Sequence, residues 1–382
     1  MSLWNINTPS IIFDSFGSID NLNLIIPKNI SNIFLVIDPS VYESNFGLKV
    51  IQQLTSYKTE IFIDFTSDPD ENSIVKGSKL YNSSRSQCII AVGGGSAIDA
   101  AKMIGLLGEN DFELESYFNN DDRNENFPFF IAVPTTCGTG AESSPYSVIK
   151  NTKIPCKRTI KRNFFIPKAV ILDPESLVSL PFEYTIAAAL DTLCHIIEVH
   201  TACTSNDLIR ISTRGSLSTF GKYFNEAIYN DNLIAKGNLL YTAFTSRLLY
   251  PGTGLSAAHS LAHPFGSYME LHHGMTVAMI IPEVLKFNEF CCGEHLKEAA
   301  TLLDTSFKDG FDIANWINNI ISTTGLNKII KEKLSEKTIP IDKICNQAMK
   351  SSNLASNPRK INNVSELKEI LEAALYKIYS VS

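Results

Sequence analysis

Short apolar runs alternate with amphipathic segments over the first half of the chain. Each run is rich in β-branched or aromatic residues and is bounded by turn residues, which is typical of strands buried on both faces of a parallel sheet. The expected strands are residues 32–38, 59–65, 86–95, 128–136 and 168–175. Segments with a helical pattern, such as residues 97–107, lie between them. This alternation predicts a doubly wound α/β domain.

The pattern changes near Pro181, where long helical periodicity begins and β-branched clusters become rare. We therefore expect two domains. Residues 1–180 form an α/β domain with a parallel sheet, and residues 181–382 form an all-helical domain.

Composition narrows the class of protein. The chain has 382 residues, of which 44% are hydrophobic and 19% are charged, as in an ordinary globular protein with material for two cores. The net charge of −7 argues against a nucleic-acid partner. We see no signal peptide and no apolar run of the roughly 18 residues that span a bilayer. The eight cysteines form no C-x-x-C pair, which favours a reducing cytoplasm.

Two glycine-rich turns each follow an expected strand. In "AVGGGSAIDAAK" the three glycines allow a ligand to approach the backbone, and Ser96 and the helix N-terminus would face an anion. The spacing is not that of G-x-G-x-x-G, so this is no ordinary Rossmann fingerprint, and a bare strand-to-helix turn is the alternative. "PTTCGTGAE" adds hydroxyls at Thr135, Thr136 and Thr139. Both turns would meet at the carboxyl edge of the sheet, where such sheets bind ligands.

Asp38 ends the first of the expected strands. A carboxylate there could bind adenosine ribose hydroxyls and would repel a 2′-phosphate, which favours NAD over NADP. An Asp-Pro turn is the alternative. The basic run "CKRTIKR", which includes Lys157 and Arg158, is either a solvated surface loop or a contact for a cofactor diphosphate or an anionic substrate.

The helical pattern "ALDTLCHIIE" places Asp191 and His195 one turn apart on one face. Alone, such a pair is usually a surface hydrogen bond. Here the flanks are apolar, so the helix is expected to be buried, and a buried carboxylate and imidazole need partners such as a metal.

Four of the seven histidines lie in "HSLAHPFGSYMELHHG". His259 and His263 are four residues apart, and His272 and His273 follow. Pro264 is expected to disfavour helical geometry at His263. Spacing leaves open which of these histidines bind a metal.

The four motifs "GGGSAIDAAK", "PTTCGTGAE", "LDTLCHIIE" and "HSLAHPFGSYMELHHG", in this order and spacing, resemble the iron-containing (group III) alcohol dehydrogenases. The resemblance runs from about Phe13 to about Asn288. It implies the dehydroquinate synthase-like fold, in which an NAD(P)-binding α/β domain and an all-helical domain have a divalent metal in the cleft between them.

The resemblance also assigns residues. Its metal ligands match Asp191, His195, His259 and His273, while His263 matches a histidine beside the nicotinamide and His272 is a non-ligand. Its cofactor contacts match Asp38, Gly94, Gly95, Ser96, Asp99, Thr135, Thr136, Thr139 and Lys157. There are departures: Ser67-Asp68-Pro69 stands where Pro-Asn-Pro is common, and Cys194 replaces a threonine.

The expected activity is that of a metal-dependent NAD(P)-linked alcohol dehydrogenase or aldehyde reductase. NAD is the expected cofactor, with NADP less favoured, and Fe²⁺ the expected metal, with Zn²⁺ the alternative. The substrate is a small alcohol or aldehyde, with phosphonoacetaldehyde as one option, and the protein is expected to be a homodimer or higher homo-oligomer. The alternatives are a zinc polyol dehydrogenase, a dehydroquinate-synthase-like lyase and a non-catalytic nucleotide-binding protein.

Overall fold

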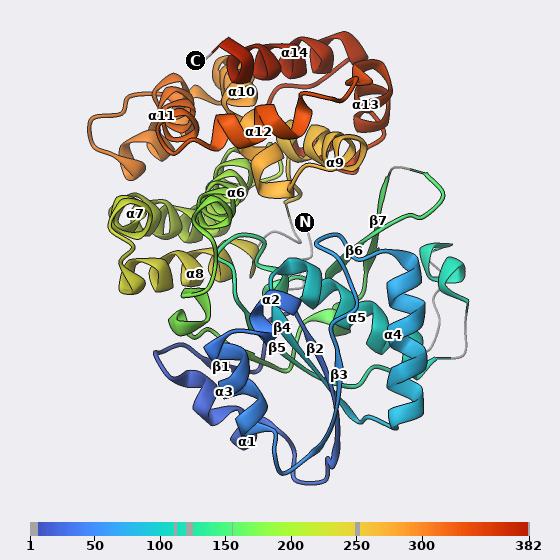
Figure 1. Cartoon of the computed structure of the whole chain (residues 1–382). Helices are drawn as coiled ribbons and strands as arrows, with labels where there is room; N and C mark the ends of the chain where they lie inside the picture. Colours follow the sequence, from blue (N-terminus) through green and yellow to red (C-terminus); the bar gives the residue numbers. More distant parts are fainter. Residues whose placement is uncertain (1–6, 111–112, 120–124, 155, 249–252, 381–382) are drawn as a thin grey trace. The chain divides into compact units, whose positions relative to one another are not determined.

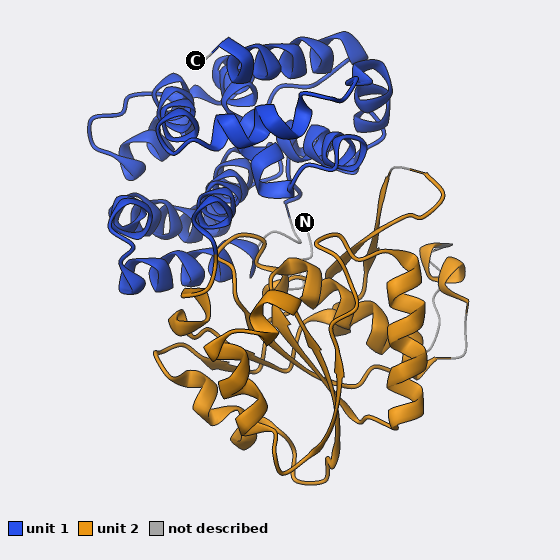
Figure 2. Cartoon of the chain, viewed as in Figure 1, with its two compact units in different colours: residues 1–5, 181–382 blue, residues 6–180 orange. Residues whose placement is uncertain are grey.

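The computed structural model describes residues 7–110, 113–119, 125–154, 156–248 and 253–380. These residues divide into two compact units, one that ends at Leu180 and one that begins at Pro181 (Figure 2). Figure 1 shows the order of the elements along the chain. No described helix has the length and apolar character needed to span a membrane.

The first unit is built on a six-stranded sheet in the order β1-β8-β5-β4-β2-β3, with every neighbouring pair parallel. The strands are β1 (Ile11–Phe13), β2 (Asn32–Ile37), β3 (Lys58–Phe62), β4 (Cys88–Gly93), β5 (Phe129–Pro134) and β8 (Ala169–Ile171). The five expected strands are thus present, and the predicted parallel α/β fold is confirmed.

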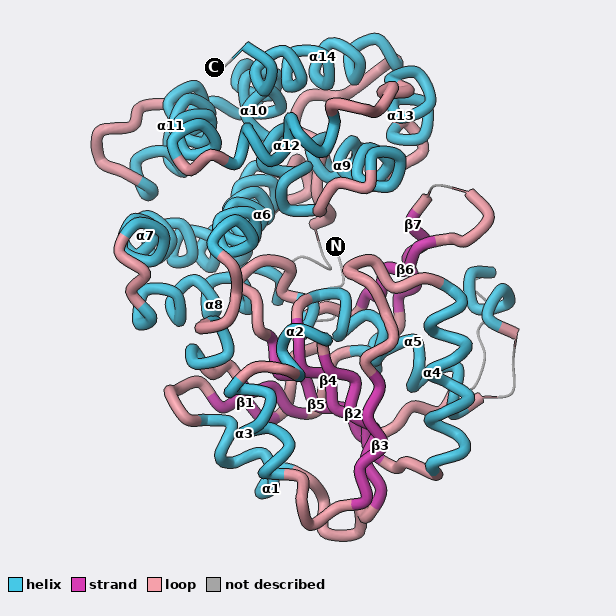
Figure 3. Tube along the Cα trace, in the orientation of Figure 1, coloured by secondary structure: helices cyan, strands magenta, loops and turns pink. Residues whose placement is uncertain are grey.

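Helices cover both faces of this sheet, shown in magenta in Figure 3. They are α1 (Leu22–Ile25), α2 (Pro39–Tyr42), α3 (Asn45–Gln53), α4 (Glu71–Ser84) and α5 (Gly95–Glu109). Alternate residues of β2 point to opposite faces: Phe34 and Val36 pack in one core with residues of α4 and α5, and Ile33, Leu35 and Ile37 pack in another with residues of α1 and α3. Burial on both faces explains why these strands read as continuous apolar runs.

Three strands were not expected from the sequence. β1 is only three residues long and lies at the edge of the sheet. β6 (Tyr146–Lys150) and β7 (Lys157–Lys161) form a separate antiparallel pair. The basic run around Arg158 is therefore largely a strand, and the interpretation of it as a surface loop was wrong. The sequence of this strand shows no clear alternation of apolar and polar residues, because a two-stranded ribbon has little apolar surface to bury and its residues are largely lysine and arginine.

The second unit consists of helices among its described residues. They are α6 (Phe182–Thr201), α7 (Asp207–Tyr229), α8 (Leu233–Leu248), α9 (Ala257–Met269), α10 (His273–Leu303), α11 (Gly310–Thr323), α12 (Leu326–Leu334), α13 (Ile341–Ala348) and α14 (Val364–Ser380). The predicted all-helical character is confirmed. Helix α6 is almost completely buried, as its apolar flanks indicate.

Candidate metal centre and cofactor-binding turns

Asp191 and His195 lie on α6 and are both buried, with 2% and 3% of their surfaces exposed. Their spacing puts them on one face of the helix. Nε2 of His195 lies 3.8 Å from Oδ1 of Asp191. Because both side chains are buried, each needs a polar or charged partner from within the protein or from a bound ion.

Helix α9 brings His259 and His263 to this point. The helix continues through Pro264, so the expectation that this proline would disfavour helical geometry at His263 was wrong. The φ of proline fits a helix, and its cost is one backbone hydrogen bond and local crowding, which the buried packing of α9 tolerates. The rings of His259 and His263 have centroids 6.1 Å apart.

A tight turn then returns the chain toward His259. Glu270 ends α9 in the left-handed conformation, with φ of 51°, and His273 begins α10 two residues after Leu271. Lys337 holds the turn by donating to the carbonyl oxygen of Met269 at 2.6 Å and by pairing with Glu270 at 3.2 Å. As a result the His273 ring lies 5.3 Å from that of His259.

Oδ1 of Asp191 is the common point of the cluster. It lies 3.4 Å from Nε2 of His259 and 3.8 Å from Nε2 of both His195 and His273. Two ligands held by one metal ion at about 2.0–2.2 Å and tetrahedral angles lie about 3.4 Å apart. Asp191, His259 and His273 each offer a ligand atom within 4.8 Å of the other two. His195 lies outside this group, although its Nε2 is equally near Oδ1 of Asp191.

Two buried atoms test whether a metal fits. Oδ1 of Asp191 and Nε2 of His259 face one another, yet neither makes a hydrogen bond with any described residue. Leaving such atoms unsatisfied is costly, and a cation between them would satisfy both. Three imidazole nitrogens and one carboxylate oxygen suit Fe²⁺ or Zn²⁺. The residues present fit the metal that the sequence predicts.

The charges of the cluster also favour a bound cation. Burial lowers the pKa of His259, but Glu198 and Asp191 raise it to about 9. Burial raises the pKa of Asp191, but His273 and His259 outweigh this effect and hold the pKa below its usual value. Two carboxylates around one imidazole thus require a positive charge, which a proton supplies when no metal is bound. A metal would replace that proton.

Glu198 is the residue that sequence reasoning missed. It is buried on α6, and its carboxylate accepts hydrogen bonds from Nδ1 of His259, from the hydroxyl of Ser256 and, at 3.2 Å, from the backbone N–H of Ala258. A carboxylate on the far nitrogen fixes the tautomer and orientation of a metal-binding imidazole. A signal was available: Glu198 is one turn beyond His195 on the same apolar helix.

His263 and His272 differ in their surroundings. The His263 ring is half-buried and its centroid lies 5.1 Å from that of His273. It is thus close to the cluster, but it is not one of the residues whose ligand atoms all lie within 4.8 Å of one another, which are Asp191, His259 and His273. His272 is exposed and packs edge-on against Tyr184, with centroids 5.1 Å apart.

In the first unit, the two glycine-rich turns lie against one another. A Cβ added to Gly94 would sit 3.0 Å from Cγ2 of Thr136, and one added to Gly95 would sit 2.7 Å from Oγ1 of Thr139. Thr135 donates its backbone N–H to the carbonyl oxygen of Gly93 at 3.0 Å. The predicted convergence of these residues at the carboxyl edge of the sheet is therefore present.

The N-terminus of α5 is suited to an anion. Gly94 occupies its N-cap position, and no side chain of the described residues caps the helix. The free N–H groups and the dipole of this 15-residue helix favour a phosphate. Asp38 directly follows β2. The next strand along the chain, β3, lies on one side of β2, and the strand after it, β4, lies on the other, so the strand order reverses here. Ligands of doubly wound sheets bind at this point.

Comparison with known proteins decides the family. Residues 9–174 match the model described as "Iron-containing alcohol dehydrogenase", and residues 185–375 match "Fe-containing alcohol dehydrogenase family, C-terminal". The chain belongs to the iron-containing alcohol dehydrogenase family. The resemblance expected from its four motifs is confirmed.

Members of this alcohol dehydrogenase family are similar in sequence and in fold. The "Probable alcohol dehydrogenase EutG" of Escherichia coli (strain K12) is 30% identical over 63% of this chain and 61% of its own length. "Aldehyde-alcohol dehydrogenase 2" of Entamoeba histolytica is 31% identical over 68% of this chain, which spans only 32% of that longer protein. The structure of sulfoacetaldehyde reductase from Bifidobacterium kashiwanohense in complex with NAD⁺ has a TM-score of 0.85 at 21% identity and covers 98% of this chain and 99% of its own.

Three of the cofactor residues that the family implies, Asp99, Lys157 and Ser96, have protein partners here. The carboxylate of Asp99 accepts the backbone N–H of Val148 at 3.1 Å, so it also holds the middle of β6. Lys157 donates to Asp68 at 2.7 Å, and the hydroxyl of Ser96 donates to the carbonyl oxygen of Ser67. The Ser67-Asp68-Pro69 departure therefore links Lys157 to the glycine turn.

Both arginines of the basic run form ion pairs with carboxylates. Arg158 forms ion pairs with Glu71 and Glu115 and stacks on Phe118, with its guanidinium carbon 3.4 Å from the ring centroid. Arg162 pairs with Glu125. These contacts compete with the binding of an anionic substrate and favour a structural role for the two arginines.

Proposed function

We propose that this protein is a metal-dependent, NAD-linked alcohol dehydrogenase that also reduces aldehydes, and that its substrates are small. The observation that carries the proposal is the buried cluster in which Oδ1 of Asp191 faces the nitrogens of three histidines from two other chain segments and its own helix. A structural metal site would be closed by protein atoms on every side, whereas His273 is only partly buried.

Asp191, His195, His259 and His273 would hold the metal, and Glu198 would fix the orientation of His259. When bound, Fe²⁺ or Zn²⁺ supplies Lewis acidity for a substrate oxygen, and the nicotinamide carries the hydride. His263, next to His273, is placed to accept or donate a proton at one of its ring nitrogens. The glycine turns, with Ser96, Thr135, Thr136 and Thr139, would bind the cofactor diphosphate.

NAD rather than NADP is supported by the carboxylate of Asp38 at the end of β2. Asp38 also accepts the backbone N–H and the hydroxyl of Ser40, at 2.9 and 2.6 Å, so it caps the short helix α2 as well. Both interpretations of this residue from the sequence are compatible with its geometry. We still expect a homodimer or higher homo-oligomer in the cytoplasm. The mass of the protein in solution tests its oligomeric state.

The test is an NADH-oxidation screen over neutral and anionic small aldehydes, with metal analysis of the same sample. The expected result is aldehyde-dependent oxidation that requires Fe²⁺ or Zn²⁺ and favours neutral aldehydes, since Arg158 and Arg162 are already paired. A lyase of this fold would show no net change in NADH. Absence of turnover after metal addition, across the whole screen, would contradict the proposal and favour a non-catalytic protein.

A further inference from the structure

A second group of metal-binding side chains lies away from the candidate metal centre, at the far end of α6. It consists of His200 on α6 and of His295 and Glu298, which are one turn apart on α10. Each offers one ligand atom, and these atoms all lie within 4.8 Å of one another. The closest pair is Nε2 of His200 and Oε2 of Glu298, at 3.2 Å.

The buried member of this group is His200, which has no exposed surface. Its Nδ1 lies 2.8 Å from the hydroxyl oxygen of Thr213. That hydroxyl has a single hydrogen, and it lies 3.2 Å from the carbonyl oxygens of both Ile209 and Arg210, either of which can accept it. When the hydroxyl donates to one of these carbonyl oxygens, Nδ1 of His200 is the donor to Thr213, and this tautomer leaves Nε2 without a proton.

This tautomer leaves a bare lone pair on Nε2. The atom is buried, makes no hydrogen bond with the described residues, and faces an oxygen of Glu298. A buried ring nitrogen and a carboxylate oxygen therefore lie 3.2 Å apart with no hydrogen bond between them, and a cation would satisfy both.

The remaining oxygen of Glu298 is occupied. Nε of Arg214 donates to Oε1 at 2.7 Å, while the contact of Arg214 with Oε2 is longer, at 3.4 Å. Oε2 therefore accepts only the longer of the two hydrogen bonds from Arg214, and it is the oxygen that also faces Nε2 of His200. A carboxylate that binds a metal through one oxygen and accepts a hydrogen bond through the other is common in metal sites, and the guanidinium would orient it.

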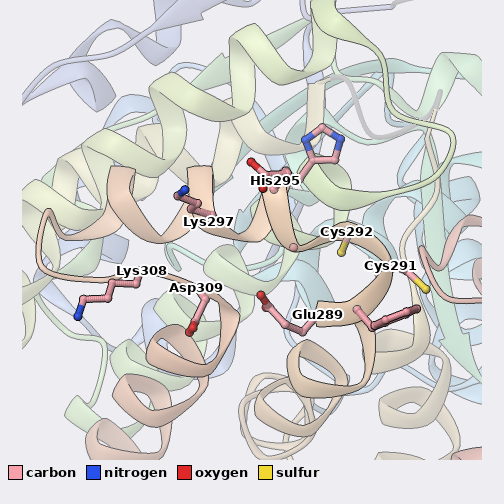
Figure 4. Close-up of a pocket in the computed structure, with 10 residues that line it drawn as sticks. Glu289, Cys291, Cys292, His295, Lys297, Lys308 and Asp309 are labelled. Carbon is pink, nitrogen blue, oxygen red and sulfur yellow. The ribbon is translucent and has the colours of Figure 1, made fainter.

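We propose that His200, His295 and Glu298 form a second divalent metal site that binds Zn²⁺. Two imidazoles and one carboxylate are a known zinc donor set, and the 3.2 Å separation of His200 and Glu298 is close to the about 3.4 Å expected around a tetrahedral ion. His295 also lines a surface hollow of about 480 Å³ together with Glu289, Cys292 and Asp309 (Figure 4), which gives the ion access.

The site would join two helices across a break. α10 has a non-helical residue at Cys292, with φ of −136°, and His295 and Glu298 both follow this break. A metal held by these residues and by His200 would fix the second part of α10 to α6. Because α6 also carries Asp191 and His195, the second metal would stabilise the helix that presents the catalytic ligands.

The experiment is a Zn²⁺ titration of the metal-depleted full-length protein against a chromophoric chelator. The wild-type protein should bind two equivalents, while His295→Gln and His273→Ala should each bind one and the double variant essentially none. His272→Gln, an exposed histidine outside both groups, should still bind two. His295 is only half-buried, so the variant is expected to fold, and far-UV circular dichroism and the melting temperature check this.

Activity separates this proposal from the proposed function. His295→Gln should keep the metal-dependent oxidation of NADH. Zn²⁺ bound at the second site should still raise the melting temperature of His273→Ala, and this contribution should be lost in His295→Gln. Binding of one equivalent by the wild-type protein, or of two by His295→Gln, would overturn the second site. In that case His200, Glu298 and Arg214 form only a hydrogen-bonded ion pair, whatever the outcome of the aldehyde screen.

Discussion

The carboxylate of Glu198 accepts a hydrogen bond from Nδ1 of His259, and this contact turns Nε2 of the same ring toward Asp191. Both residues are buried, so water cannot replace the carboxylate. The orientation of a metal ligand is therefore set by a residue that does not itself reach the metal position.

Glu198→Gln should weaken metal affinity by about 10–100-fold, the usual cost of losing such a partner. The amide keeps the shape of the side chain but removes the charge that makes His259 a good ligand. Competition of the purified protein with a chelator measures the change. Glu183→Gln, at the start of the same helix, is the control, and equal affinities of the two variants would show that Glu198 has only a packing role.

His273→Ala should lose activity together with one equivalent of metal, the one at this centre, because it removes a side chain that faces Oδ1 of Asp191. His272→Ala changes the neighbouring exposed residue and should retain both. Metal content per chain and the rate of NADH oxidation are measured on the same samples. A His273→Ala protein with a full equivalent of metal at this centre would refute the ligand assignment.

His263→Ala should lower the maximal rate by about 10²–10⁴-fold if the ring transfers a proton in the rate-limiting step, since this is the usual contribution of a general acid or base. The metal content should not change. The pH profile of the rate distinguishes this role from simple packing. An unchanged rate and profile would remove His263 from the proton path.

Asp38→Asn should raise the preference for NADPH relative to NADH by about tenfold, equal to ~1.4 kcal/mol of repulsion removed from a 2′-phosphate. Asparagine is also a good N-cap, so the turn to Ser40 should persist. Asp304→Asn is a matched control, since Asp304 makes the same two contacts with Ser306 at 2.8 and 2.6 Å. If both variants keep the wild-type ratio of kcat/KM for the two cofactors, Asp38 does not select NAD.

Gly274→Ala should destabilise the protein by about 1–3 kcal/mol, as overpacking of a core does. Its added Cβ would sit 2.4 Å from the carbonyl oxygen of Ala187, so α10 and α6 would have to move apart beside His273. Gly215→Ala, on the exposed face of α7 with nothing within 4 Å, should instead stabilise by about 0.5–1 kcal/mol. Urea unfolding of both variants measures the difference, and equal midpoints would contradict the close approach of α6 and α10.

The sequence by itself determined five of the six strands of the main sheet, the change to helices at Pro181, the pairing of Asp191 with His195, and the two glycine turns. All of these depend on local periodicity and on neighbours along the chain. It did not find β6 and β7, because a short ribbon with charged residues on its open face carries no clear apolar alternation.

Only the tertiary structure decided which side chains surround Oδ1 of Asp191. The choice depends on the helix that continues through Pro264 and on the left-handed turn at Glu270, which together bring His273 back to His259. It also brought Glu198 to His259 and His200 to Glu298. Spacing along one helix fixes only which residues share a face, whereas a metal site needs atoms from several segments to meet at one point, and packing alone determines that.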